Sequence, residues 1–149
     1  MPFILVDTCV FVRLSGAYKT TLDCIMDTSD VIGWTNEIMN EYEGRAYPSM
    51  LTLQAFIQDL KNKAKWKFFS RSFVDSNFRR HKSVRTVFYP HHSPDKKWVR
   101  VAVAIRARYI ISTNGHLLET PPNRINGDIV ENIDPSRYIA ERCPNGDTC

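Results

Sequence analysis

Short apolar runs alternate along this chain with longer segments in which apolar residues recur every three or four positions. The runs have the length of β-strands: residues 3–6 (FILV), 31–34 (VIGW), 86–89 (TVFY), 109–112 (YIIS) and 128–133 (DIVENI). Because they are mostly apolar on both faces, they are typical of parallel strands that are covered on both sides. We therefore expect a parallel five-stranded sheet.

Helices are expected between these strands, where the apolar spacing has a helical period. The predicted helices span residues 18–28, 36–46, 50–66, 95–107 and 135–142. The fourth has a clear pattern, in which Trp98, Val99 and Ala102 share the buried side and Lys97 and Arg100 face water. The alternation predicts a three-layer α/β/α domain, in which ligands bind beyond the carboxyl ends of the strands.

The composition agrees with one globular domain. The chain has 149 residues, of which 43% are hydrophobic and 24% are charged, values that argue against wholesale disorder. We assign residues 1–142 to a single domain and residues 143–149, which lack any periodicity, to a flexible tail. No apolar run approaches the 18 residues of a membrane span, so no membrane partner is expected.

The four cysteines do not form a metal-binding pattern. They lie at Cys9, Cys24, Cys143 and Cys149, without a CxxC pair and without histidines at zinc-ligand spacing. We expect reduced thiols in a cytoplasmic protein, with Cys143 and Cys149 able to bridge only the tail.

Three acidic residues fall near the carboxyl ends of predicted strands. Asp7 follows the first strand directly, Glu41 lies in the helix after the second, and Asp95 begins the fourth helix. Taken singly, Asp7 can cap a helix, Glu41 can be a surface acid, and Asp95 can complement a helix dipole. Taken together, they would repel one another: like charges about 4 Å apart cost roughly 4 kcal/mol at an effective dielectric constant of ~20. Such a cluster favours a bound cation, and oxygen ligands suit Mg²⁺ or Mn²⁺.

The segment YIISTNGHLL (109–118) places a polar turn at the end of another predicted strand. Asn114 in this turn has two interpretations. It can cap the helix that follows, or it can stand in a site where a carboxylate would be expected.

The order of these segments resembles PIN-domain nucleases, above all the prokaryotic PIN proteins associated with toxin–antitoxin systems. The stretches that carry the resemblance are FILVDTCVFV, WTNEIMNEYEGR and SPDKKWVRVAVAIRARYIISTNGHLLE. It extends from about residue 3 to residue 133 and is most specific at Asp7-Thr8, at Glu41-Tyr42 and in residues 102–118. Residues 61–92 and the part of the chain after residue 135 contribute little to it.

The resemblance implies a PIN-like fold and a hydrolase activity. The activity would be that of an endoribonuclease dependent on Mg²⁺ or Mn²⁺, which leaves a 5′-phosphate and a 3′-hydroxyl. The cation would lower the pKa of a bound water for attack on phosphorus. The resemblance also implies a toxin with an antitoxin protein as partner and a homodimer, for which the helix at 50–66 offers apolar surface.

Position by position, Asp7, Glu41 and Asp95 match the first three acids of the family. The fourth acid of the family sits in a Thr-x-Asp-x-x-Leu frame, and Asn114 occupies its place here. An amide keeps one acceptor oxygen but loses the charge, so it is a weaker metal ligand. A first metal at Asp7 and Asp95 is compatible with this set, whereas a second lacks one of its carboxylates.

Two hydroxyl residues are candidates for supporting roles. Thr8 and Ser112 can orient a bound water or an aspartate carboxylate by hydrogen bonding, or they can be plain turn residues. His116 is close to the site, but a single histidine at a helix start is more often structural.

The net charge of +4 is distributed unevenly along the chain. Of the 20 lysine and arginine residues, 12 lie between residues 61 and 100, where Asp75 and Asp95 are the only acids. Aromatic residues alternate with these cations over residues 61–85, which is typical of RNA binding, with phosphates on cations and bases on rings. The residues expected to contact RNA are Lys65, Lys67, Arg79 and Arg80. The alternative is a pair of amphipathic helices with aromatics in the core and lysines in water.

Other classes with a strand-terminal aspartate fit less well. A receiver-like domain needs a second adjacent acid and a lysine after its last strand, and a haloacid-dehalogenase-type phosphatase needs Asp-x-Asp, whereas this chain has Asp7-Thr8-Cys9. No glycine-rich phosphate loop is present. The main alternative is a non-catalytic PIN-like module that binds RNA or protein. Asn114 favours it, and the retention of three repulsive acids argues against it.

Overall fold

The computed structural model describes residues 2–82 and 86–144. Its elements are, in chain order, β1 (Phe3–Val6), α1 (Thr8–Phe11), α2 (Lys19–Asp27), β2 (Val31–Trp34), α3 (Asn36–Gly44), α4 (Met50–Asn62), β3 (Trp66–Phe68), α5 (Arg71–Lys82), the 3₁₀ helix η1 (Ser93–Asp95), α6 (Lys96–Ile105), β4 (Tyr109–Ile111), α7 (Gly115–Leu118), β5 (Asn123–Ile125), β6 (Asp128–Ile133) and α8 (Pro135–Arg142). The chain is therefore an α/β protein, as the sequence predicts.

The sheet has the strand order β3-β2-β1-β4-β6-β5. The pairs β3–β2, β2–β1, β1–β4 and β4–β6 are parallel, and β5 pairs with β6 in the antiparallel direction. The prediction of an all-parallel, five-stranded sheet is thus wrong on two points, since the described residues form six strands and the sheet is mixed. The hairpin between β5 and β6 turns at Asn126-Gly127, both at positive φ, and Asn-Gly is a favoured pair for such two-residue turns.

The predicted strand at residues 86–89 does not form. The backbone of Phe88 pairs instead with the side chain of Asn123, whose Oδ1 accepts from the Phe88 N–H at 2.8 Å and whose Nδ2 donates to the Phe88 carbonyl at 3.1 Å. The amide side chain of Asn123 thereby makes the two backbone hydrogen bonds that a neighbouring strand would otherwise make to Phe88. The edge strand β3 lies inside the basic run, and the predicted helix at 50–66 ends before it. Ala64 adopts a left-handed conformation there, and the Lys65 N–H reaches back to the Leu60 carbonyl, as at many helix ends.

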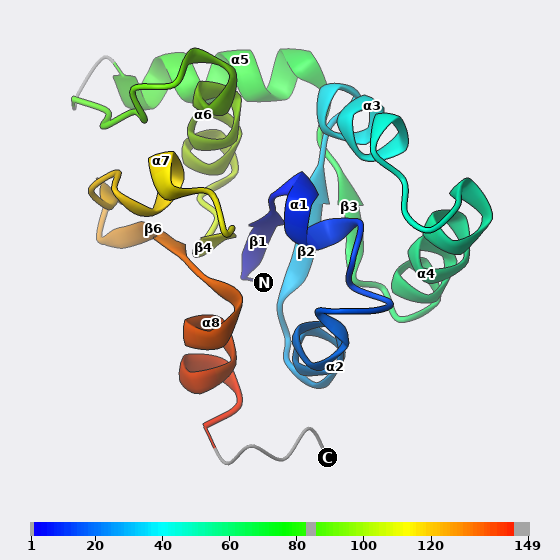
Figure 1. The fold of residues 1–149 in the computed structure, drawn as a ribbon. Coiled ribbons are helices and arrows are strands. Elements are labelled where there is room, and N and C mark those ends of the chain that lie inside the picture. The colour runs from blue at the N-terminus through cyan, green and yellow to red at the C-terminus, as the bar shows by residue number, and fades with distance from the viewer. Residues whose placement is uncertain (1, 83–85, 145–149) are drawn as a thin grey trace.

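Helices cover both sides of the sheet. Figure 1 shows α5 and α6 on one side and α2 and α8 on the other. Helix α6 packs on β1 and β4, and α2 packs on α8. The strands between these layers are fully buried over Leu5, Val6, Ile110 and Ile111, which explains why their sequences are apolar on both faces.

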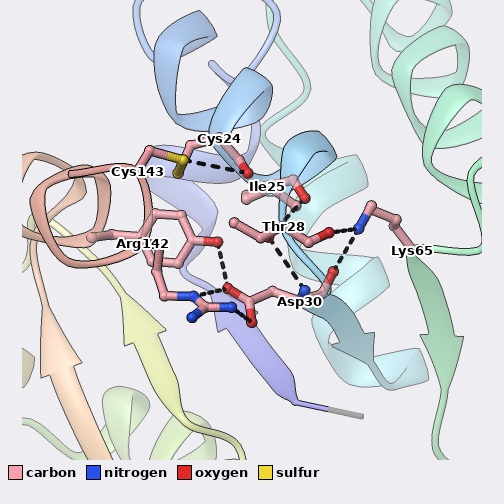
Figure 2. The surroundings of a disulfide bond; sticks show 8 residues. Cys24, Ile25, Thr28, Asp30, Lys65, Arg142 and Cys143 are labelled. Carbon is pink, nitrogen blue, oxygen red and sulfur yellow. Dashed lines mark hydrogen bonds and ion pairs between the residues drawn. A yellow bond between two sulfur atoms is a disulfide. The ribbon is translucent and has the colours of Figure 1, made fainter. Parts of the chain in front are cut away.

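The residues at the end of α8 are bonded to the segment that runs from α2 to the start of β2. A disulfide joins Cys24 of α2 to Cys143, just after α8. Beside it, Arg142 places two nitrogens 2.9 and 3.0 Å from the carboxylate of Asp30, as Figure 2 shows. The expectation of reduced thiols is therefore wrong for Cys24 and Cys143, because two elements far apart in sequence pack side by side. Cys9 is free, while Cys149 and the rest of the predicted tail from residue 145 lie outside the described residues.

Within residues 2–82 and 86–144, no helix combines the length and the apolar character needed to cross a membrane.

Candidate active site

Asp7 lies where β1 ends and α1 begins, at the middle of the sheet. Its carboxylate caps α1 by accepting a hydrogen bond from the Thr8 N–H at 2.8 Å. It also accepts one from the Ser112 hydroxyl at 2.6 Å, and Asp7 is only 6% exposed. Burial raises the pKa of this carboxyl, the hydrogen bonds partly oppose the rise, and the charge of Glu41 adds to it. Asp7 is thus both a helix cap and a buried carboxylate.

Ser112 connects Asp7 to the polar turn that follows β4. Its hydroxyl donates to Asp7 Oδ2 and accepts from the Asn114 N–H at 2.9 Å. Parallel pairing of β1 and β4 brings these residues together, since Val6 lies opposite Ile111. The fully buried Ser112 therefore orients the carboxylate, as one of its two sequence interpretations proposed.

Asn114 uses its side chain to cap α7. Its Oδ1 accepts a hydrogen bond from the His116 N–H at 2.9 Å. Asn114 is only partly exposed, and its backbone N–H bonds to Ser112, which in turn bonds to Asp7. The two interpretations of Asn114 are therefore compatible, because the cap sits at the edge of the same cluster.

Glu41 reaches the cluster from α3. This helix is capped by Thr35, which follows β2, and it is anchored by Tyr42, whose hydroxyl donates to the Val6 carbonyl. One oxygen of Glu41 accepts from the Thr8 hydroxyl at 2.6 Å. The other forms an ion pair with Lys97 of α6. Burial, Asp7 and Glu41 together raise the pKa of Tyr42 well above its usual range, which keeps this phenol neutral.

Asp95 lies at the junction of η1 and α6 and is 8% exposed. One carboxylate oxygen is 3.0 Å from Nδ1 of His92. The His92 ring stacks on that of His116, with centroids 5.1 Å apart and planes inclined by 13°. Because His116 follows the Asn114 cap, this histidine pair links Asp95 to the turn after β4.

Short contacts join Asp7, Glu41 and Asn114, whereas Asp95 is linked to the turn after β4 through the stacked rings of His92 and His116. Glu41 touches Thr8, Thr8 and Ser112 both bond to Asp7, and Ser112 bonds to Asn114. Among the described residues, no group of three or more acidic, histidine or cysteine side chains is arranged to hold a metal ion.

Three further residues lie at the cluster that the sequence did not predict as site residues. Lys97, expected in water, pairs with Glu41; His92 pairs with Asp95; and the Cys9 thiol lies 3.6 Å from Asp7 Oδ2 and 3.1 Å from Thr113 Oγ1. Their proximity to the acids in sequence was the only available signal. Proximity alone does not distinguish a site residue from a surface residue.

The predicted RNA-contacting residues divide into two groups. Lys67, Arg79 and Arg80 are exposed on β3 and α5. Lys65 directly precedes β3, at the amino end of that strand. Its ammonium donates there to the carbonyls of Thr28 and Asp30 (Figure 2). Lys65 is therefore held against the backbone between α2 and β2 and does not belong to the acidic cluster.

The aromatic residues of the same run are also divided. Phe69 and Phe78 are buried, whereas Phe68 and Phe73 are 41% and 42% exposed. The core interpretation therefore holds for part of the run only, and one helix and one strand replace the suggested helix pair.

A groove of about 650 Å³ opens next to the cluster, between α3, α5 and α6. Its walls combine the amides Asn36 and Asn40 with acids and cations. The charged residues are Glu37, Asp75, Arg71, Lys97 and Arg100. Lys97 thus belongs both to this groove and to the acidic cluster.

The chain was compared with models of protein families, with curated proteins and with solved structures. None of the three comparisons finds a match.

Proposed function

We propose that this chain is a PIN-like, metal-dependent endoribonuclease. The observation that carries the proposal is the contact network at the carboxyl edge of the sheet, in which Asp7 and Glu41, from separate elements, are joined through Thr8. Asp7 is buried there with a raised pKa, and perturbed carboxylates of this kind concentrate at functional sites. An edge where parallel strands end is also where α/β proteins bind ligands.

The acids have the oxygen donors that a hard divalent cation prefers, although the described residues do not group three such side chains around one point. Carboxylate oxygens are preferred ligands of Mg²⁺ and Mn²⁺, so Asp7 and Asp95 would hold the ion with help from Glu41. Such an ion, when bound, stabilises negative charge on phosphate oxygens and lowers the pKa of a water ligand.

The other residues of the cluster act on the acids themselves. The Ser112 hydroxyl and the Thr8 N–H fix the carboxylate of Asp7, and the Thr8 hydroxyl fixes that of Glu41. The Asn114 oxygen already caps α7, which favours a site with one cation over a site with two. Exposed Lys67, Arg79 and Arg80 are proposed to contact RNA phosphates outside the site.

The direct test is cleavage of a mixed, structured RNA with Mg²⁺ or Mn²⁺. The unaltered chain, Asp7→Asn and Asn114→Asp are compared side by side. We expect cleavage by the unaltered chain and a loss of roughly 10²-fold or more in Asp7→Asn, since a preorganised charge is removed from the reacting centre. If cleavage persists in Asp7→Asn, the proposed site is wrong. If only Asn114→Asp cleaves RNA, the amide has silenced an otherwise complete site.

A second candidate, a non-catalytic module that binds RNA or protein, is favoured by the amide at position 114. The two candidates differ in their response to Mn²⁺. A nuclease site should raise the melting temperature with Mn²⁺, by the equivalent of about 2.7 kcal/mol at a hundredfold excess over Kd. The shift should vanish in Asp95→Ala. A binding module would show RNA binding with no such shift.

A toxin role with an antitoxin partner and a homodimer complete the proposal, and they rest on the PIN resemblance. The expected cytoplasmic location rests on the sequence instead, and its argument from reduced thiols does not apply to Cys24 and Cys143. For the dimer, α4 offers less apolar surface than its sequence suggests. Leu53, Phe56, Ile57 and Leu60 face the chain's own core, while Leu51 is 78% exposed. Growth arrest on expression of the unaltered chain, relieved in Asp7→Asn, would support the toxin role.

A further inference from the structure

Lys97 is a cation built into the acidic cluster. It lies in the first turn of α6, two residues after Asp95, and forms an ion pair with Oε2 of Glu41. The Lys97 and Glu41 side chains are only 23% and 22% exposed. Because water screens such a pair less than it screens a pair on the open surface, the ammonium is held more firmly than most surface lysines.

The position of this ammonium connects the groove to Asp7. The second oxygen of Glu41 accepts from the hydroxyl of Thr8, and the backbone of Thr8 donates to Asp7. Lys97 also lines the groove, where Arg71 and Arg100 both form ion pairs with Asp75. An RNA phosphate bound in this groove would therefore meet Lys97.

The charges of the cluster call for one divalent ion rather than two. Asn114 contributes no charge, and Lys97 already balances Glu41. Asp95 lies against His92, and Asp7 has no basic side chain at ion-pair distance among the described residues. The charge left to balance therefore suits a single divalent cation. A site with a fourth carboxylate could balance a second ion, which would also stabilise the phosphate.

We propose that Lys97 binds a non-bridging oxygen of the scissile phosphate and supplies the charge that a second metal ion would otherwise provide. The inference rests on the proposed nuclease function. In that hydrolysis, water oxygen bonds to phosphorus, the bond to the 3′-oxygen breaks, its electron pair leaves with that oxygen, and the oxygen takes a proton from the water. Lys97 stays protonated throughout and stabilises the charge on phosphorus-bound oxygens.

The test compares Lys97→Met with Lys96→Met. Lys96 is the matched control, because it is the preceding residue of α6, is exposed, and lies over the Tyr89 ring rather than on Glu41. We expect Lys97→Met to lower kcat roughly 10²- to 10³-fold, as removal of one transition-state donor does. It should also weaken RNA binding several-fold in EDTA, where no cleavage occurs. Lys96→Met should change neither quantity by more than about twofold.

A rescue experiment distinguishes phosphate binding from a merely structural ion pair. Aspartate is also a good helix cap, so Asn114→Asp should leave α7 intact. The double variant Lys97→Met/Asn114→Asp should bind two Mn²⁺ per chain by titration calorimetry, against one for the unaltered chain, and should regain cleavage at high Mn²⁺. A lowered melting temperature in Lys97→Met with no rescue would overturn the proposal in favour of a structural role.

The outcomes also separate this proposal from the nuclease function. If no variant cleaves RNA but RNA affinity in EDTA depends on Lys97 and not on Lys96, the nuclease fails and Lys97 stands as a phosphate contact in a binding module. If RNA affinity and cleavage are both indifferent to Lys97, the proposal for Lys97 fails whatever the activity of the chain.

Discussion

The carboxylate of Asp7 occupies a place that is costly for a charge. It is almost excluded from water, and the two hydrogen bonds from Thr8 and Ser112 compensate only part of the lost hydration, because the pKa of the group remains raised. A binding site gains from this arrangement. The carboxylate is fixed in place before a ligand arrives, and a cation relieves the penalty that burial imposes.

The raised pKa of Asp7 predicts how stability depends on pH. The native state keeps this proton to a higher pH than the unfolded chain, in which the pKa is near 3.8. The Asp7 contribution to stability is therefore full below that pH and declines as pH rises through the higher native pKa. We expect Asp7→Asn to remove this decline and to raise the free energy of unfolding at pH 7 in EDTA. Urea titrations between pH 3 and 8 measure both effects; a steeper decline in Asp7→Asn would contradict the assignment.

Ser112 is expected to matter more than an ordinary buried serine. Ser112→Ala removes the donor to Asp7 and leaves the Asn114 N–H without its acceptor. We expect a loss of about 1–3 kcal/mol in the free energy of unfolding and a further rise in the Asp7 pKa. The exposed Ser76 of α5 serves as control, and Ser76→Ala should change stability by less than about 0.5 kcal/mol. Equal effects of the two substitutions would show that Ser112 has no special role.

At the scale of elements, α8 depends on contacts at its last turn. Asp30 is fully buried and is satisfied by Arg142 and by the Tyr138 hydroxyl at 2.7 Å. Burial and the charge of Asp30 raise the pKa of Tyr138, so this tyrosine remains a neutral donor. Helix α8 is therefore attached to the start of β2 through the buried carboxylate of Asp30, which needs Arg142 as its counter-ion.

Removal of that partner should be far more damaging than removal of a surface cation. Arg142→Leu leaves the Asp30 carboxylate buried without its counter-ion, which typically costs about 3–5 kcal/mol. Arg137→Leu, on the same helix, removes ion pairs to Glu131 and Glu141 from a side chain that is 50% exposed, which should cost about 1 kcal/mol or less. Chemical denaturation of both variants tests the difference, and similar losses would contradict the proposed attachment.

The sequence predicts elements well where apolar periodicity alone determines them. The strands at 3–6, 31–34 and 128–133 form with the predicted bounds. The run at 86–89 does not, because the deciding partner of Phe88 is a side chain 35 residues away. Similarly, Asp7 was identified from its place after a strand, whereas the pairing of Lys97 with Glu41 depends on how α6 packs near α3. Such contacts between distant elements leave no periodic signal in the sequence.

At the scale of the whole molecule, the exposed cations of β3 and α5 lie on the chain segment richest in basic residues. Each phosphate contact to a single strand changes the slope of log affinity against log salt by about 0.7. We expect Lys67→Glu and Arg79→Glu each to reduce the magnitude of that slope for RNA by at least this amount. Lys19→Glu, on α2 at the other side of the sheet, is the control. Equal slopes in all three variants, measured by fluorescence anisotropy, would exclude RNA contact by this segment.

The disulfide between Cys24 and Cys143 also divides the candidate site mechanically. The two cysteines are 119 positions apart, so the chain between them forms a covalent ring. Glu41, Asp95 and Asn114 lie inside this ring, and β1 with Asp7 lies outside it. Force applied to the chain on either side of the ring would pull β1 from between β2 and β4 while the ring stayed closed. Single-molecule extension should therefore separate Asp7 from the other candidate residues in a first step, and only reduction should allow the ring itself to extend.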